Sequence, residues 1–467
     1  KWKQWWFLLK FDFKGVIKAV PFIAITLCGV LLLLSNTSNL GQMYGTTTHP
    51  VTYMILDILT GNFMLFLIII ITFYSGELIW KEISVKLAPI VDAVPLSDSM
   101  FLTAKFGAMI LVELFLLIVL IVTGVLMQAM NGYTNFELAI YIKSILLNTF
   151  PYLVLLTLLT FFIHSMVNNK FLGHTLVILF WIGNIVLAAF DITHNLVWYG
   201  NAPTESYSAM NGFGHFVKPV LFFDFYWLML GIILFMVGLL MSKRGSEIDF
   251  KSRFRKMKSM WKEGHGRLII PVAFALFIIC GGFIYYNTNV LNVYRAPDAE
   301  KKMRADYEKN YKKYTNTPQP RIAALKIAAD IFPEERRCEF KATMTLKNKN
   351  VVAVDTLVVA LPSDQQFKKL NIAGGYKTLI NDSVAGFFTY KLNKPIAPGD
   401  SIDMDFELVY AAKGFANDGG STSIVYNGTF INNGLLPSIG YGDQSELSDD
   451  DDRKKYNLPV KYQQYHS

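Results

Sequence analysis

The sequence predicts an α-helical polytopic membrane domain of about seven spans, followed by an all-β sandwich or saddle domain. The chain of 467 residues is 52% hydrophobic and only 17% charged, which is too apolar for an ordinary soluble protein. Apolar stretches of about 20 residues, long enough to cross a bilayer, recur through residues 1–286. Beyond residue 320 the hydrophobic period changes from helical to two, which is typical of strands.

Segment 1–14 precedes the first span and alternates tryptophan and phenylalanine with lysine, which predicts an interfacial elbow helix. Six spans then lie in 15–241, a basic loop in 242–267 and a seventh span in 268–286. All seven apolar runs are continuous rather than alternating, which favours helices over barrel strands. The runs are Val16–Leu34, Val51–Tyr74, Phe101–Met130, Ile145–Met166, Phe171–Phe190, Pro219–Met241 and Leu268–Tyr286.

Lysine and arginine predict the orientation of these spans. With a cytoplasmic N-terminus, the inside segments hold about 18 basic residues, whereas the outside loops hold only Lys143 and Lys218. The C-terminal part is then exported. The net charge of +8 is explained by topology, so it requires no nucleic acid. The basic loop 242–267 is expected to lie on anionic lipid, with phosphate binding as the alternative.

The exported part begins with a stalk, 287–320, and continues as a β-domain, 321–467. High helix propensity and opposite charges three or four residues apart predict a helix over Asp298–Tyr314. Alternating apolar residues predict strands over Cys338–Leu346 and Ile402–Leu408. Turn signals between such segments indicate about eight strands.

Three acidic residues, Asp57, Glu113 and Asp224, lie within the predicted spans. Ionisable groups in hydrocarbon are expensive, so each one is a candidate intramembrane polar site. The alternative is an interhelical hydrogen bond with no further role. Glu113 is the strongest candidate because it lies furthest from the ends of its span.

Catalytic motifs are absent from the sequence. It contains neither a G-x-x-x-x-G-K-[ST] phosphate loop nor H-E-x-x-H, so we predict no catalytic, cofactor-binding or metal-ligating residue in this chain. A few acidic and histidine residues of the outside loops could meet as ligands, although packing within the loops explains them better. They are His49, His194, His215, Asp191 and Glu205.

Segment Glu77–Val94 lies between the second and third spans and predicts an amphipathic helix with an apolar face suited to docking a partner. That face comprises Ile79, Ile83, Leu87, Ile90 and Val94. The candidate docking residues are Glu77, Trp80, Glu82 and Pro95.

The order of elbow helix, two spans, acidic amphipathic helix, proline and lysine resembles a type-2 ABC exporter permease, with Glu82, Pro95 and Lys105 as the matching residues. Other motifs resemble large bacterial proteins in which permease modules are fused to an exported aminopeptidase N-type zinc metallopeptidase. These motifs are His164, Asn168–Lys170, Gly173–His174, Tyr207–His215 and Phe283–Asn292. Several exported motifs resemble the noncatalytic β-rich N-terminal domain of that peptidase. They are Pro318–Arg321, Pro333–Arg336, Pro398–Asp400 and Leu436–Tyr441.

This resemblance implies a multi-pass protein of the bacterial cytoplasmic membrane, in contact with lipids and partnered by an ABC ATPase and a second permease module. It also implies that the full-length protein handles peptides and holds zinc in a catalytic domain. The G-x-M-E-N and H-E-x-x-H motifs of such a domain are absent, and the chain starts at Lys1 without methionine, so we expect a piece of a longer protein.

Three functional hypotheses follow. The chain is the permease and β-domain portion of a membrane-anchored zinc aminopeptidase. Alternatively, it is an exporter permease subunit whose β-domain handles substrate, or a nonenzymatic membrane anchor with a binding domain.

Overall fold

The computed structural model describes residues 1–35, 42–43, 46–94, 96–242, 266–420, 423–426 and 428–461. The chain divides into two compact units, which are described separately. The helical unit comprises Lys1–Phe190, His194–Glu205 and Phe216–Tyr286. The β unit comprises Asp191–Thr193, Ser206–His215 and Asn287–Ser467. The predicted basic loop 242–267 falls largely outside the described residues.

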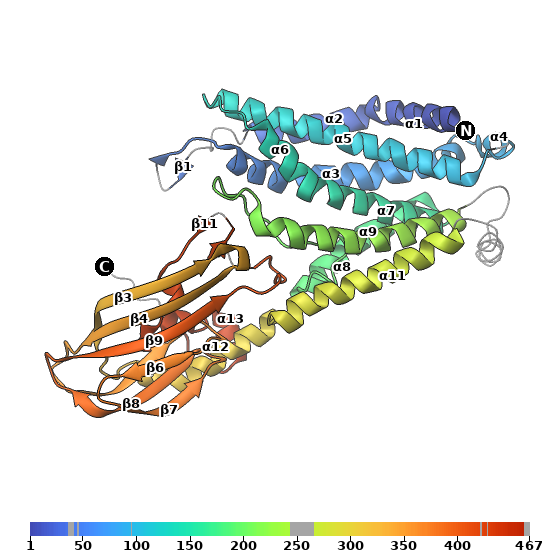
Figure 1. Cartoon of the computed structure of the whole chain (residues 1–467). Coiled ribbons are helices and arrows are strands. Elements are labelled where there is room, and N and C mark those ends of the chain that lie inside the picture. Colours follow the sequence, from blue (N-terminus) through green and yellow to red (C-terminus); the bar gives the residue numbers. More distant parts are fainter. Residues whose placement is uncertain are drawn as a thin grey trace. The chain divides into compact units, whose positions relative to one another are not determined.

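The helical unit is a bundle of long helices (Figure 1). Its first half holds α1 (Trp2–Ile17), α2 (Val20–Ser35), the short pair β1 (Gln42–Met43) and β2 (Thr46–Thr47), α3 (Thr52–Ser84), α4 (Ala88–Asp92) and α5 (Asp98–Met130). Its second half holds α6 (Leu138–Ser144), a π-helical turn (Ile145–Thr149), α7 (Phe150–Met166), α8 (Lys170–Ala189), α9 (Val217–Leu240) and α11 (Gly266–Tyr285).

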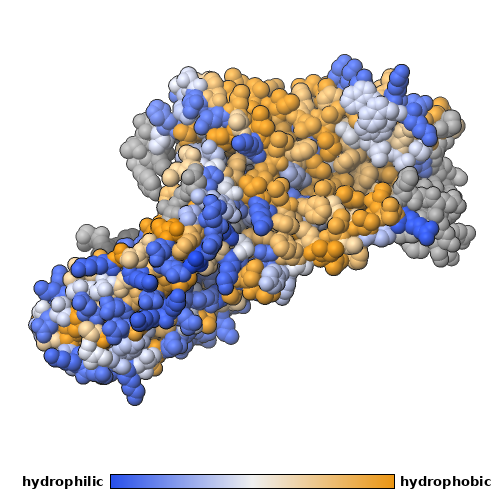
Figure 2. Space-filling model, in the orientation of Figure 1, coloured by the Kyte–Doolittle hydropathy of each residue, from blue (hydrophilic) through white to orange (hydrophobic). Residues whose placement is uncertain are grey.

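The prediction of about seven apolar spans is confirmed at the level of length and composition. Six helices of the described chain are long and apolar enough to cross a membrane, and α1 with α2, bent by 60°, makes a seventh if the pair is counted as one span. The bend separates the predicted elbow helix from the first apolar run. Hydrophobic side chains cover much of the visible surface of the helical unit (Figure 2), as expected for a bundle solvated by lipid.

The centre of the bundle is built around α3, whose buried side chains recur every three or four residues and so share one face. These residues, all without exposed surface, are Ile55, Leu59, Phe63, Leu67 and Ile70. Helices α5 and α7 pack against this face with their own apolar stripes. Because nearly every residue of α3 is apolar, its internal face is selected by packing against α5 and α7.

After a π-helical turn (Tyr286–Leu291), the β unit contains the stalk helix α12 (Pro297–Tyr311), which confirms the helix predicted over Asp298–Tyr314. Two four-stranded antiparallel sheets follow, so the predicted number of about eight strands is confirmed. The first sheet has the order β3 (Arg321–Phe332), β4 (Arg337–Lys347), β9 (Ser401–Ala411), β6 (Lys369–Ile372). The second has the order β12 (Ser438–Ile439), β5 (Val354–Ala360), β8 (Phe387–Ile396), β7 (Tyr376–Asp382). A hairpin, β10 (Ile424–Val425) with β11 (Gly428–Thr429), and the helix α13 (Asp450–Lys455) complete the unit.

Alternation along β4 and β9 places one row of side chains between the two sheets and the other row in solvent. The inward row of β4 meets that of β9 in register, for example Phe340 opposite Leu408 and Met344 opposite Met404. Side chains from β5 and β8 close the same core from the other sheet. The period-two pattern of the sequence thus predicts the sandwich core correctly.

The second sheet is covered on both faces, because α12 packs Tyr307 and Tyr311 against Val358 and Phe387. The ring of Tyr311 stacks on that of Phe387 with centroids 4.1 Å apart. Aromatic burial of this kind stabilises the fold and orients the stalk helix on the sheet. The first sheet has its outward face open to solvent.

Gly386, in the turn between β7 and β8, has a φ of +67°, and a Cβ there would collide with the backbone carbonyl of Leu361. We expect Gly386→Ala to destabilise the β unit by about 2–3 kcal/mol, since backbone strain and the collision add. The control is Gly399→Ala, where φ is +85° but the space is open, so only the strain remains. Thermal unfolding of the two variants in detergent measures the difference, and equal midpoints would contradict the expectation.

Candidate functional site

The C-terminal end of α3 is tied to three other helices by ion pairs. Because α3 has 33 residues and rises about 1.5 Å per residue, it is roughly 50 Å long and exceeds the hydrocarbon thickness. Its last two turns carry acidic and basic residues whose partners lie on α1, α5 and α8. The pairs are Lys81–Asp12 at 2.7 Å, Lys105–Glu82 at 2.5 Å and Lys170–Glu77 at 2.5 Å.

The ion pairs differ in burial. Lys105 on α5 is the most buried lysine of the three, with its side chain 9% exposed, and it pairs with Glu82 on α3. A buried ammonium group without a partner is strongly unfavourable, so the Glu82–Lys105 pair holds α3 and α5 together. Glu77 and Glu82, predicted to dock an ATPase, are therefore engaged within the chain.

Trp80 is also internal. Its indole N–H donates a hydrogen bond of 3.2 Å to Nδ1 of His164, and both side chains are buried. The His164 ring lies edge-on to that of His174, with centroids 4.7 Å apart. Gly76 and Gly173 border these rings so closely that a Cβ on either glycine would collide with an imidazole. Small residues thus allow α3, α7 and α8 to approach each other around the two histidines.

The prediction of one amphipathic helix over Glu77–Val94 is wrong. Helix α3 continues to Ser84, the chain then turns at Val85–Leu87 with Lys86 at a φ of +59°, and α4 is a separate helix of five residues. Pro89 at the start of α4 explains the break, because proline cannot continue a preceding helix but suits a first turn. Pro95 lies outside the described residues.

Around this break several apolar side chains point into solvent. Those that are at least 39% exposed are Ile83, Val85, Leu87, Ile90 and Val94. We call these five residues the α3–α4 apolar surface. The same sequence pattern that suggested one helix thus produces an exposed apolar surface on a turn and a short helix, bordered by the ion-paired end of α3.

Glu113 is placed as the sequence predicts, in the interior of the bundle. It lies on α5 without exposed surface, and its Oε1 accepts a hydrogen bond from the hydroxyl of Thr157 on α7. Its Oε2 has no hydrogen-bond partner among the described residues. A carboxyl group half-satisfied in this way is costly to retain for packing alone.

Asp57 and Asp224 both interact electrostatically with Glu205, which the sequence placed only in a loop, whereas burial and Thr157 are the influences on Glu113. Burial raises the pKa of Glu205, and a hydrogen bond from Asn148 opposes that effect only in part. The helical unit therefore has two separate acidic places, one around Glu113 and one around Glu205. Sequence spacing does not predict the acidic group around Glu205, because Asp57, Glu205 and Asp224 lie far apart in the sequence.

The remaining loop candidates are divided between the two units. Among them, His49, His194 and Glu205 belong to the helical unit, whereas Asp191 and His215 belong to the β unit. Within the residues that the structure describes, no group of three histidine, cysteine, aspartate or glutamate residues could hold a metal ion.

Comparison with models of known protein families and with curated proteins found no match. Fold and geometry therefore define this protein only by class. Its described residues form a bundle with six to seven membrane-type apolar helices and an antiparallel β-sandwich unit.

Proposed function

We propose that this chain is a permease-like module of an ABC-type exporter in the bacterial cytoplasmic membrane. Its N-terminus lies in the cytoplasm, its β-domain is exported, and its α3–α4 apolar surface docks an ATPase subunit. The observation that carries the proposal is that the exposed α3–α4 apolar surface lies next to the ion-paired end of α3. Three ion pairs brace α3 at the point from which that surface projects.

Docking at this place suits energy transfer for a physical reason. A partner that pushes on α4 acts on α3 directly, because only three residues separate the two helices. The ion pairs then distribute the displacement to α1, α5 and α8. Glu113, at the contact of α5 with α7, is a polar group within the bundle that such a movement would reach, and we assign it to the transport path.

The second candidate function is that this chain is the noncatalytic part of a membrane-anchored zinc aminopeptidase. In support, the sequence motifs that resemble the noncatalytic peptidase domain fall in the β unit, which is a sandwich of two antiparallel sheets. Zinc and the catalytic residues would then be supplied by sequence that follows Ser467. Determining about 200 residues of sequence after Ser467 tests this second candidate function, since a catalytic region without H-E-x-x-H would contradict it.

Ile90, on α4 and 66% exposed, gives the sharpest test of docking. We expect Ile90→Glu to reduce co-purification of the ATPase subunit by about tenfold or more, because it places a charge within the proposed apolar contact at a largely exposed side chain. The amount of ATPase subunit recovered per permease from native membranes is the measurement.

Val351→Glu is the matched control, because this valine of the β unit is 93% exposed and lies far along the chain from α4. It should leave the recovery of ATPase unchanged. Equal recovery with Ile90→Glu and with the unaltered chain would overturn the docking assignment.

A further inference from the structure

Strand β3 is an unusually long free edge. It forms one border of the first sheet with 12 residues, whereas the other borders are β6 with 4, β7 with 7 and β12 with 2. Edge strands are normally short or shielded, because their unpaired N–H and C=O groups can pair with another chain. In the described structure β3 pairs with β4 alone.

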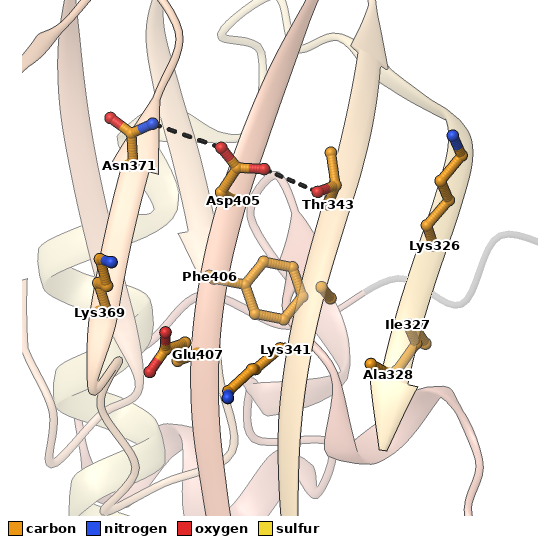
Figure 3. A pocket seen from close by; sticks show the side chains of 11 residues that line it. Lys326, Ile327, Ala328, Lys341, Thr343, Lys369, Asn371, Asp405, Phe406 and Glu407 are labelled. Atoms are coloured by element: carbon orange, nitrogen blue, oxygen red, sulfur yellow. Dashed lines mark hydrogen bonds between the residues drawn. The ribbon is translucent and has the colours of Figure 1, made fainter. Parts of the chain in front are cut away.

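Both faces of β3 are uncovered as well. Ile327 and Ile331 pair with inward residues of β4, yet they are 43% and 42% exposed. On the outward face, Lys326 and Ala328 border a shallow pocket in which Thr343 and Asn371 donate hydrogen bonds to Asp405 (Figure 3). Asp330 follows on the same outward face.

We propose that β3 pairs antiparallel with β3 of a second copy of this chain, around a two-fold axis at Ala328. Such an axis places residue 328 − n of one copy opposite residue 328 + n of the other. Lys326 of each copy then lies opposite Asp330 of its partner, so two opposite-charge pairs form on the outward face. On the other face Leu325 lies opposite Ile331.

The register follows from charge and from strand geometry. An axis at residue 326 would place lysine opposite lysine, and an axis at residue 330 would place aspartate opposite aspartate. An axis at residue 327 or 329 would leave both charged residues opposite apolar residues. The irregularity in the pairing of β3 lies between Ile322 and Ala324. The regular remainder, 324–332, is symmetric about Ala328, so this register uses all of it.

Lys326 and Asp330 are exposed, and neither forms an ion pair within the described residues. Pairing between copies gives each an opposite charge and also brings Leu325 of one copy beside Ile331 of the other. It joins the β3–β4–β9–β6 sheet of one copy to the same sheet of the other, which gives one sheet of eight strands. The pairing involves the β unit alone and does not rest on the proposed docking of an ATPase.

Charge reversal tests the pairing on the full chain in detergent, with the mass of the complex measured by light scattering. We expect the unaltered chain to dimerise, and Lys326→Asp or Asp330→Lys to raise the dimer dissociation constant by about tenfold, because each variant creates two like-charge pairs. The double variant Lys326→Asp/Asp330→Lys should dimerise like the unaltered chain. A monomeric unaltered chain, single variants that dimerise normally, or a double variant that fails to recover would each overturn the proposal.

A cross-link at the axis gives an independent measurement. Ala328→Cys places two thiols opposite each other across the two-fold axis, within reach of a disulfide or a short thiol cross-linker. Val351→Cys, 93% exposed and in the segment between β4 and β5 rather than on β3, is the control for random collision. Covalent dimer should form with Ala328→Cys in dilute membranes and far less with Val351→Cys or with the unaltered chain. Equal yields would contradict the pairing.

Discussion

Arg453→Ala should destabilise the β unit by about 3–5 kcal/mol, because it leaves the Glu308 carboxylate buried without its main partner. Both side chains are 1% exposed. The guanidinium donates two hydrogen bonds to Glu308, of 2.8 and 2.9 Å, and two more to the carbonyls of Leu447 and Pro459. The pair connects α12 to α13, so its loss should release the stalk helix from the C-terminal part of the unit.

Cys338 provides the readout, since its thiol is buried in the sandwich core and becomes reactive only when that core opens. Thermal unfolding followed by thiol labelling of this residue should shift to lower temperature in Arg453→Ala and less in Arg453→Lys, which keeps the charge. Lys454→Ala is the matched control, because Lys454 and its partner Asp451 are 70% and 92% exposed, and the expected loss is below about 1 kcal/mol. An unchanged midpoint in Arg453→Ala would contradict the assigned role.

The same pair predicts how stability depends on pH. Burial opposes ionisation of Glu308, but hydrogen bonds from Arg453 and Lys312 outweigh it and hold the pKa of this carboxyl below its ordinary value. The stabilisation is therefore complete above the pKa of an unfolded glutamate, about 4.3, and is lost as the pH falls through the lower folded value. In Arg453→Ala this acid-dependent part of the stability should largely disappear.

The second large effect is expected at the braced end of α3. Glu82→Lys deprives the enclosed Lys105 of its partner and adds a like charge beside it. We expect a loss of about 3–5 kcal/mol in the contact between α3 and α5, measured as a lower melting temperature of the helical unit in detergent.

The swapped pair Glu82→Lys/Lys105→Glu restores opposite charges and should recover most of that stability. Lys86→Glu, a charge reversal on a neighbouring exposed lysine, should change stability by less than about 0.5 kcal/mol. If the swapped chain is stable but no longer binds the ATPase subunit, Glu82 also contacts the partner. A single Glu82→Lys variant as stable as the unaltered chain would show that the ion pair is not structural.

The sequence predicts much of this architecture because the two hydrophobic periods are clear. Continuous apolar runs mark α3, α5 and α9, and alternation marks β4 and β9. It fails where local geometry overrides periodicity, as at Lys86, where a turn with positive φ and the following Pro89 split the predicted docking helix.

The candidate sites were predictable only in part. The burial of Glu113 follows from its place in an apolar run, whereas its contact with Thr157 depends on how α5 and α7 pack. No spacing pattern signals the pairs Asp12–Lys81 and Glu308–Arg453, whose members are 69 and 145 residues apart. Long-range partners of this kind are set by the tertiary fold.

One consequence of the length of α3 concerns mechanics. The helix runs unbroken from Thr52 to Ser84, so its peptide hydrogen bonds form a stiff rod of about 50 Å. Asp57 lies near one end of this rod and Glu82 near the other. If a partner tilted α3 about the middle of the bundle, a displacement at Glu82 would therefore produce one at Asp57 in the opposite direction.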